Sequence, residues 1–405
     1  KVLTGQRRVG KSCILMQLME DIKRDDSEAN IIYINMEHEE FRMIHDDSDL
    51  FQYLKGTMPP DKNNYLFIDE IQDIQGFENV LRSLQSKDSC DIFITGSNAK
   101  MLSGELATYL SGRYIEFCKS TIDSDIDLKG LKIFVDCANG AASATAPGLF
   151  GKLPLHADFI FDKPDGININ NGCGSTHMET LCRGVVAGKY DLGIAFDGDA
   201  DRCLLVDEKG HIIDGDKVLA VCGKAMRRKG SLNGNAIVAT VMSNLGLHEF
   251  CRKGDFLLVC TDVGDRHVLE KMIECGYMIG GEQSGHTIFR EYATTGDGEL
   301  TALQFIQAYC EAGVPASELI SCCAQYPQEL INVPVSAVGG AKERIMADDR
   351  LWEQVRSQEE ALNGEGRILV RPSGTEALIR VMVEAKTVEI AHNVAKTLAE
   401  FIKTL

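Results

Sequence analysis

The feature that most constrains this chain is an apolar segment, YDLGIAF at 190–196, followed directly by the acidic sequence DGDADR at 197–202. Continuous apolarity is typical of a buried strand, so the acidic residues lie where that strand opens into a loop. Small Gly and Ala spacers let the backbone bend, and carboxylate oxygens are ligands that Mg²⁺ prefers. The pattern predicts a magnesium site at the end of the strand, formed by Asp197, Asp199 and Asp201.

Two other interpretations of the acidic loop are weaker. A solvated acidic turn would account for one or two aspartates, but poorly for three in register behind an apolar strand. A calcium loop of the EF-hand type would use the same aspartates together with Glu208. In that alternative Arg202 occupies the position that requires glycine, and a strand precedes the loop where a helix is needed.

Strand-like and helix-like segments alternate through much of the chain. Strand-like runs that open into loops containing Gly, Asn or Asp occur at 127–143, 235–244 and 255–266, and helix-like runs accompany them at 217–229 and 265–276. Such alternation predicts α/β domains with largely parallel sheets, whose ligand loops lie at the carboxyl ends of the strands. Strand-like runs and a closing amphipathic helix after residue 326 predict a smaller α+β domain.

Length and composition bound the class of protein. A chain of 405 residues can form roughly two to four domains with their own cores. The net charge of -18 argues against a general affinity for nucleic acids or anionic membranes, whose phosphates repel an acidic surface. The 14 cysteines show no C-x-x-C spacing, which favours a reducing cytoplasm, and no signal peptide or membrane-length apolar run is visible.

The N-terminal segment carries a phosphate-binding pattern. Gly5-x-x-x-x-Gly10-Lys11-Ser12 stands between a short apolar run and an amphipathic helix, which is the context that a P-loop requires. The loop amides would hold the phosphates of ATP, Lys11 would reach the β and γ phosphates, and Ser12 would ligate Mg²⁺. The alternative is a chance match in an ordinary turn.

An acidic pair, Asp69-Glu70, follows the apolar run at 64–68. A nucleotidase places at this position the carboxylate that holds Mg²⁺ and the one that activates water. With GQRRVGKS, FIDEIQ, ITGSNA and L-x-GR, roughly the first 115 residues resemble prokaryotic AAA-like ATPases. The resemblance implies a P-loop NTPase fragment over 1–111 that binds ATP. It assigns nucleotide binding to Gly5, Gly10, Lys11 and Ser12, a Walker B role to Asp69 and Glu70, and a phosphate-facing position to Arg113. Independently of the resemblance, Ser97 and Asn98 are polar residues at the end of the next predicted strand, where they would sense the γ phosphate.

The segment GGEQSGH at 280–286 carries groups suited to a sugar. Glu282 and Ser284 offer an acceptor and a donor to vicinal hydroxyls, and the glycines allow close approach of the backbone. An ordinary polar turn explains the segment equally well.

The segment RPSGTE at 371–376 forms a compact anion cradle. Its amides, two hydroxyls and the Arg371 guanidinium suit a phosphate, and Arg380 would add a second fork. The alternative is a helix start capped by Ser373 or Thr375.

Together these segments resemble the α-D-phosphohexomutases, and the phosphoglucosamine mutase branch in particular. VDCANGAA, NINNGCGSTH, IAFDGDADR, GGEQSGH, TTGDG and RPSGTE-x-LIRVMVE carry the resemblance from about Gly112 to Leu405, and Gln283 distinguishes this branch. The resemblance implies domains at 112–217, 218–325 and 326–405. It implies Mg²⁺ ligation by Asp197, Asp199 and Asp201, phosphosugar contacts from Glu282, Ser284, Arg371, Ser373, Gly374, Thr375 and Arg380, and support from Arg202, Arg266 and His286.

Members of this family convert glucosamine 6-phosphate to glucosamine 1-phosphate, toward cell-wall precursors, by phosphoryl transfer from a phosphoserine. That serine lies in a TASHNP-like segment of the family's first domain, and this sequence has no such segment. Ser12 belongs to the P-loop, so no catalytic residue is assigned. We therefore expect a mutase by descent with little or no turnover.

The two resemblances meet at GRYIEF, residues 112–117, which suits both families. A natural fusion more often joins intact domains through a polar linker. Two truncated domains that meet in a short shared sequence indicate a chimera, formed by recombination or by sequence assembly. Two alternatives remain: an ATPase with a phosphosugar-sensing tail, and a non-catalytic phosphosugar binder.

Overall fold

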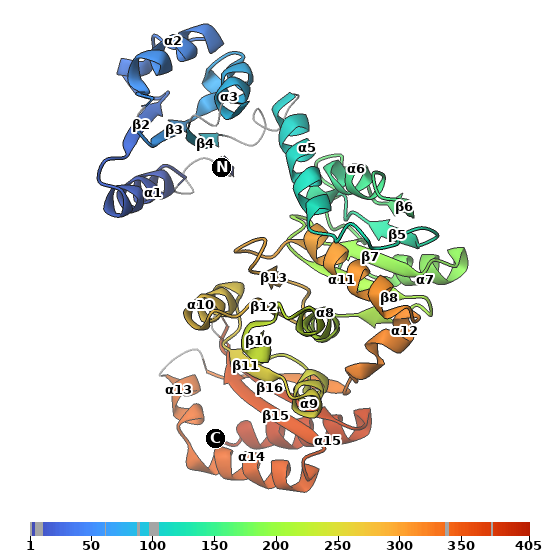
Figure 1. Ribbon diagram of the computed structural model, residues 1–405. Helices are drawn as coiled ribbons and strands as arrows, with labels where there is room; N and C mark the ends of the chain where they lie inside the picture. Colours follow the sequence, from blue (N-terminus) through green and yellow to red (C-terminus); the bar gives the residue numbers. More distant parts are fainter. Residues whose placement is uncertain are drawn as a thin grey trace. The chain divides into compact units, whose positions relative to one another are not determined.

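Figure 1 shows the computed structural model of the chain, which describes residues 2–4, 11–60, 62–86, 90–96, 105–336, 340–373 and 376–405. The chain forms two compact units, Lys1–Tyr114 and Ile115–Leu405. Both units combine β-sheets with helices, as the alternating sequence pattern predicts.

The first unit is built on a parallel sheet with the strand order β1-β4-β3-β2. Parallel neighbours need long crossover connections, and helices supply them here. The strands are β1 (Val2–Thr4), β2 (Asn30–Asn35), β3 (Asn64–Asp69) and β4 (Asp91–Gly96), and the helices are α1 (Lys11–Asp25), α2 (Asp47–Thr57) and α3 (Phe77–Ser86).

Alternate residues of these strands pack on the two faces of the sheet. Phe67 of β3 and Phe93 of β4 stack with ring centroids 4.5 Å apart, and Leu15 of α1 joins their cluster. Leu66 and Ile68, the neighbours of Phe67 in β3, lie on the opposite face of the sheet. They pack in the cluster to which α2 and α3 contribute. Figure 1 shows α1 on one side of the sheet and α2 with α3 on the other.

The chain passes from the first unit to the second within helix α5 (Glu105–Ser120). Ile115 and Cys118, on the last turns of this helix, are buried. Just beyond it, the side-chain amide of Gln304 donates a hydrogen bond of 3.1 Å to the carbonyl of Thr121. The C-terminal end of α5 therefore packs and hydrogen-bonds within the second unit.

The second unit begins with a five-stranded sheet of order β6-β5-β7-β8-β9. Strands β6, β5 and β7 are parallel, whereas β8 and β9 are added antiparallel. The strands are β5 (Lys132–Asp136), β6 (His156–Ile160), β7 (Leu192–Phe196), β8 (Cys203–Asp207) and β9 (Ile212–Ile213), with helices α6 (Ala146–Phe150) and α7 (Glu179–Gly188).

A four-stranded sheet follows, of order β11-β10-β12-β13. Its strands are β10 (Ala236–Thr240), β11 (Leu257–Thr261), β12 (Ile279–Gly281) and β13 (Thr287–Phe289). Its helices are α8 (Gly215–Lys229), α9 (Leu245–Gly254), α10 (Asp265–Cys275), α11 (Gly298–Ala312) and α12 (Ala316–Leu319). Helix α11 contacts α8 and also β7 and β8 of the preceding sheet, so the two sheets share one helical layer.

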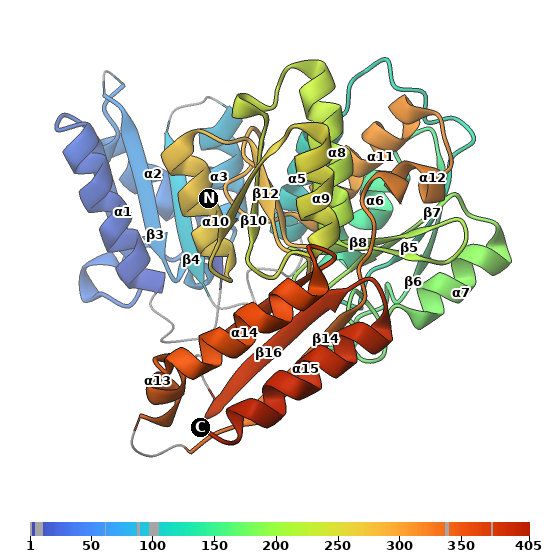
Figure 2. The same ribbon diagram turned by 90° about the horizontal axis from the view of Figure 1, so that it is seen from below.

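The C-terminal part is an antiparallel sheet of order β14-β16-β15. Figure 2 shows α14 and α15 on the same face of this sheet, and side chains from both helices join its core. The elements are β14 (Gln328–Pro334), α13 (Ala341–Met346), α14 (Asp349–Leu362), β15 (Gly366–Pro372), β16 (Leu378–Ala385) and α15 (Val388–Ile402).

The predicted mixed α/β architecture of the second unit is confirmed, but the expectation of largely parallel sheets holds only in part. Strands β8, β9 and β13 are antiparallel to their neighbours. The loops before β8 and β13 are too short for a crossover, so each pair forms a hairpin. None of the helices in the described ranges has the length and apolarity needed to cross a bilayer.

Candidate active site

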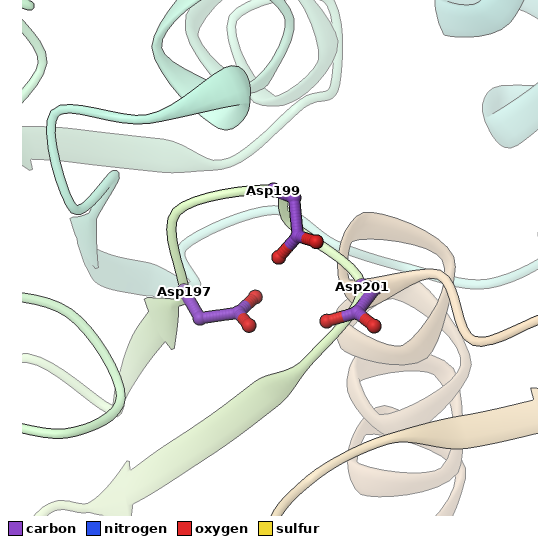
Figure 3. Close-up of side chains that lie close together, drawn as sticks. All are labelled: Asp197, Asp199 and Asp201. Atoms are coloured by element: carbon purple, nitrogen blue, oxygen red, sulfur yellow. The ribbon is translucent and has the colours of Figure 1, made fainter. Parts of the chain in front are cut away.

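The acidic loop at 197–202 emerges from β7, all five residues of which are buried. One carboxylate oxygen from each of its three aspartates lies within 4.8 Å of the others. Figure 3 shows the three side chains pointing toward a common space. The structure therefore brings together the residues predicted to bind Mg²⁺, here called the metal triad: Asp197, Asp199 and Asp201.

Two other sequence motifs support the backbone of this loop. The amide of Ala141 donates to the carbonyl of Gly198 at 2.9 Å, and the amide of Gly298 donates to the carbonyl of Ala200 at 2.9 Å. A Cβ at Gly140 would lie only 2.3 Å from the Gly198 oxygen, so this close approach requires glycine. The segments VDCANGAA and TTGDG thus position the metal loop.

The electrostatics of the triad suit a cation. Burial raises the pKa of Asp197 to about 7, and the neighbouring Asp201 and Asp199 carboxylates add to the shift. The Nε of Arg202 lies 3.9 Å from oxygens of both Asp197 and Asp201, so its charge compensates the triad only weakly. Asp201 Oδ1 is buried and accepts no hydrogen bond from the described residues. Clustered hard oxygens with an unsatisfied acceptor fit Mg²⁺.

Two residues predicted to support catalysis lie in very different surroundings. His286 is only 3% exposed, its Nε2 accepts from the amide of Gly296 at 3.0 Å, and its Nδ1 lies 3.1 Å from Asp201 Oδ2. The bond to Gly296 makes Nδ1 the donor to Asp201. His286 therefore orients a triad carboxylate. Arg266 is 82% exposed and pairs with Glu270 at 2.7 Å.

The predicted sugar loop is held from two sides. Glu282 accepts from the amide of Gly264 through Oε1 at 3.0 Å, while its Oε2 lies 3.4 Å from the hydroxyl of the exposed Ser284. Gln283, the residue that distinguishes the branch, donates to Asp214 at 3.3 Å. Its side chain is thus engaged with the protein, and Glu282 and Ser284 remain the groups suited to sugar hydroxyls.

The predicted phosphate loop carries two facing arginines. Arg371 of β15 and Arg380 of β16 are directly opposite in the antiparallel register, where like charges are unfavourable. Burial lowers the pKa of Arg371, and the charge of Arg380 adds to the shift. Arg380 Nε is buried without a hydrogen-bond partner among the described residues. An anion between the two arginines would reduce their mutual repulsion and would accept a hydrogen bond from Arg380 Nε. Ser373 is buried nearby, and Gly374 and Thr375 lie outside the described residues.

The acidic pair in the first unit is already bonded to the protein. Asp69 accepts from the hydroxyls of Thr95 and Tyr33, and is only 2% exposed. Glu70 lies 4.0 Å from the ammonium of the buried Lys11. Lys11 and the acidic pair therefore meet at the ends of α1 and β3, as a P-loop site requires.

The other nucleotide-site predictions are tested less fully by the structure. Ser12 and Arg113 are exposed. The remaining predicted positions lie outside the described residues: Gly5, Gly10, Ser97 and Asn98.

Both units resemble known protein families. Family profiles for phosphoglucomutase/phosphomannomutase match at 112–210 (alpha/beta/alpha domain II), 214–326 (alpha/beta/alpha domain III) and 330–401 (C-terminal domain). A phosphoglucosamine mutase of Clostridium novyi is 47% identical over 345 residues, covering 84% of this chain and 74% of that protein. The chain belongs to the phosphoglucosamine mutase family.

Another family member, the phosphoglucosamine mutase of Desulforudis audaxviator, is 51% identical over 290 residues, which span 72% of this chain and 63% of that protein. The first unit matches a different profile, an AAA domain, at residues 1–122. The crystal structure of Aspergillus fumigatus N-acetylphosphoglucosamine mutase with GlcNAc-6P and magnesium has a TM-score of 0.61 at 19% identity, covering 87% of this chain and 80% of that one. That likeness supports the phosphohexomutase fold.

Three contributors to these sites were not identified from the sequence. Thr95 bonds the carboxylate of Asp69, the buried Glu299 bonds the hydroxyl of Thr145, and Lys342 bonds the ends of the phosphate loop. Thr95 lies within ITGSNA, where only Ser97 and Asn98 were given a role, and the other two lie outside the quoted motifs. Their spatial partners lie 26 to 154 residues away, so only the fold brings them together.

Proposed function

We propose that the second unit binds Mg²⁺ and a glucosamine phosphate as phosphoglucosamine mutases do. The observation that carries the proposal is the convergence of three under-compensated carboxylates on a loop bonded, through His286, to the sugar loop. Facing arginines on β15 and β16 provide the phosphate end of the same kind of substrate. The cofactor is Mg²⁺, held by the metal triad.

Each loop has a separate role in this proposal. Bound Mg²⁺ would supply charge stabilisation for phosphoryl transfer. Glu282 and Ser284 would bind sugar hydroxyls, while Arg371 and Arg380 would hold the phosphate that is not transferred. Arg202 would limit repulsion within the triad when no cation is present.

We further propose that this chain turns over slowly or not at all by itself. Phosphoryl transfer in the family needs a phosphoserine in a TASHNP-like segment, and the 405 residues contain none. The metal and sugar loops would then bind substrate without a phosphoryl donor. We place the protein in a reducing compartment such as the cytoplasm, since all 14 cysteines are free.

The test combines calorimetry and a coupled assay on the full chain. Glucosamine 6-phosphate should bind saturably, and binding should weaken at least tenfold in Arg371→Met because a charged hydrogen bond is lost. Glucosamine 1-phosphate should not form at an ordinary enzymatic rate of about 10 s⁻¹. Product at that rate would overturn the proposal of a defective mutase, and absence of binding would overturn the phosphosugar site. Binding without product would also fit a non-catalytic phosphosugar binder.

A second candidate function is ATP hydrolysis by the first unit. The proximity of Lys11 to Glu70, beside a buried Asp69, favours it. Hydrolysis should be lost in Lys11→Ala and in Glu70→Gln, and ATP binding should survive only in the second variant. Equal hydrolysis in wild type and both variants would exclude this activity.

A further inference from the structure

Lys342 lies against the two ends of the phosphate loop. It is the second residue of α13, a helix separated from the loop by about thirty residues of sequence. Its ammonium donates to the carbonyl of Ser373 at 2.8 Å and to that of Glu376 at 3.2 Å. These carbonyls belong to the residues that flank positions 374 and 375 in the sequence.

We propose that Lys342 is a positioning residue for the phosphate loop, and that its charge also strengthens binding of the substrate phosphate. The inference deepens the proposed function, since it takes the 371–376 loop as the phosphate site. An ammonium offers three donors. Two of them bridge the loop ends, and no carboxylate of the described residues lies within ion-pair distance of Lys342. Its positive charge therefore has no carboxylate partner in that part of the chain, and it lies at the carbonyl of Ser373, two residues along the chain from Arg371.

Other bonds close the loop but leave a role for Lys342. The amide of Ser373 donates to the carbonyl of Leu378 at 2.9 Å, and the amide of Glu376 donates to the hydroxyl of Ser373 at 3.2 Å. These bonds join the ends of the loop directly. Lys342 joins the same ends to a separate helix, so it fixes the loop relative to the rest of the C-terminal domain. Anion binding is strongest where such donors are held in place before the ligand arrives.

The first experiment measures hydrogen exchange of the ligand-free full chain, comparing Lys342→Met with wild type. The amides of Ser373 and Glu376 should exchange at least about fivefold faster in the variant, because the loop ends lose their tie. The amide of Val381, in the middle of β16, should not change. Lys396→Met removes an equal charge from the exposed side of α15 and should leave all three amides unchanged. Unchanged exchange at Ser373 and Glu376 in Lys342→Met would overturn the positioning role.

The second experiment measures binding of inorganic phosphate and of glucosamine 6-phosphate by calorimetry. Both dissociation constants should rise about tenfold in Lys342→Met, should stay near wild type in Lys396→Met, and should be largely restored in Lys342→Arg. A loosened loop with unchanged dissociation constants would reduce Lys342 to a structural role and overturn the proposal. If wild type binds neither compound, the proposed function fails, while the exchange experiment still decides whether Lys342 holds the loop.

Discussion

Each unit of this protein places acidic residues at the carboxyl end of a buried strand, but the two sets differ in what surrounds them. Asp69 in the first unit accepts from two hydroxyls, and Glu70 faces Lys11. In the metal triad, Asp199 is exposed, and the buried Asp201 Oδ1 has no hydrogen-bond partner among the described residues. An acidic sequence after a strand thus becomes a strong metal-site candidate when the protein leaves its carboxylates unsatisfied.

The largest effect should come from the triad itself. Asp199→Asn removes a carboxylate that makes no other bond in the described structure, so Mg²⁺ affinity should fall about 100-fold. In the absence of nucleotide, Asp69→Asn should leave the Mg²⁺ affinity of the full chain unchanged. Calorimetric titration with Mg²⁺ measures both variants. Equal losses in the two variants would remove the distinction between the sites.

Stability should change in opposite directions at the two sites. Asp69→Asn breaks a buried bond from Thr95 or Tyr33, so the first unit should lose about 2 kcal/mol of unfolding free energy. Asp199→Asn relieves repulsion between carboxylates, so the Mg²⁺-free second unit should gain about 0.5 kcal/mol. Native-state hydrogen exchange of the β3 and β7 amides reports each unit separately. With saturating Mg²⁺ the second difference should reverse, because the ion binds the wild-type site more tightly and so stabilises it more.

His286 gives a smaller effect through a positioned ligand. His286→Phe keeps an aromatic ring but removes the donor to Asp201, so Mg²⁺ affinity should fall about tenfold. The exposed His267 serves as a control, and His267→Phe should bind Mg²⁺ as wild type does. An unchanged affinity in His286→Phe would show that the triad is positioned by its backbone alone.

The last prediction concerns Glu299, a carboxylate of which only one oxygen is hydrogen-bonded in the described structure. One of its oxygens bonds Thr145, and the other is buried without a partner among the described residues. Burial raises the pKa of Glu299 from 4.5 to about 8. The unfolding free energy that the protonated Glu299 contributes is fully present below pH 4.5. It falls as pH rises and is lost once pH passes about 8.

Glu299→Gln should not show this pH-dependent loss of stability, because glutamine does not ionise. Between pH 5 and pH 8.5 the unfolding free energy of wild type should fall up to about 4 kcal/mol further than that of the variant. Denaturant titrations followed by the fluorescence of Trp352, the single tryptophan, measure the difference. Parallel pH profiles would show that Glu299 is ionised in the folded state.

Local patterns predicted much of the fold and of the site. The apolar run before DGDADR is the buried β7, and the spacing of its aspartates brings the metal triad together. The same patterns could not give strand direction, which depends on loop length and pairing. For this reason the antiparallel β8 and β13 were not expected.

Partners distant in sequence account for the remainder. His286 meets Asp201 across 85 residues, and Lys342 meets Ser373 across 31. Such contacts depend on how sheets and helices pack, which one sequence does not specify. The burial of His286 likewise follows from packing, so its position beside Asp201 could only come from the structure.

The most direct test of the central claim is ³¹P NMR of the full chain with glucosamine 6-phosphate and Mg²⁺. We predict that the substrate resonance broadens on binding, that Arg371→Met abolishes the broadening, and that no resonance of glucosamine 1-phosphate accumulates. Accumulation of glucosamine 1-phosphate at about 10 s⁻¹ would contradict the proposed lack of turnover. A substrate resonance unaffected by the wild-type protein would contradict the phosphosugar site itself.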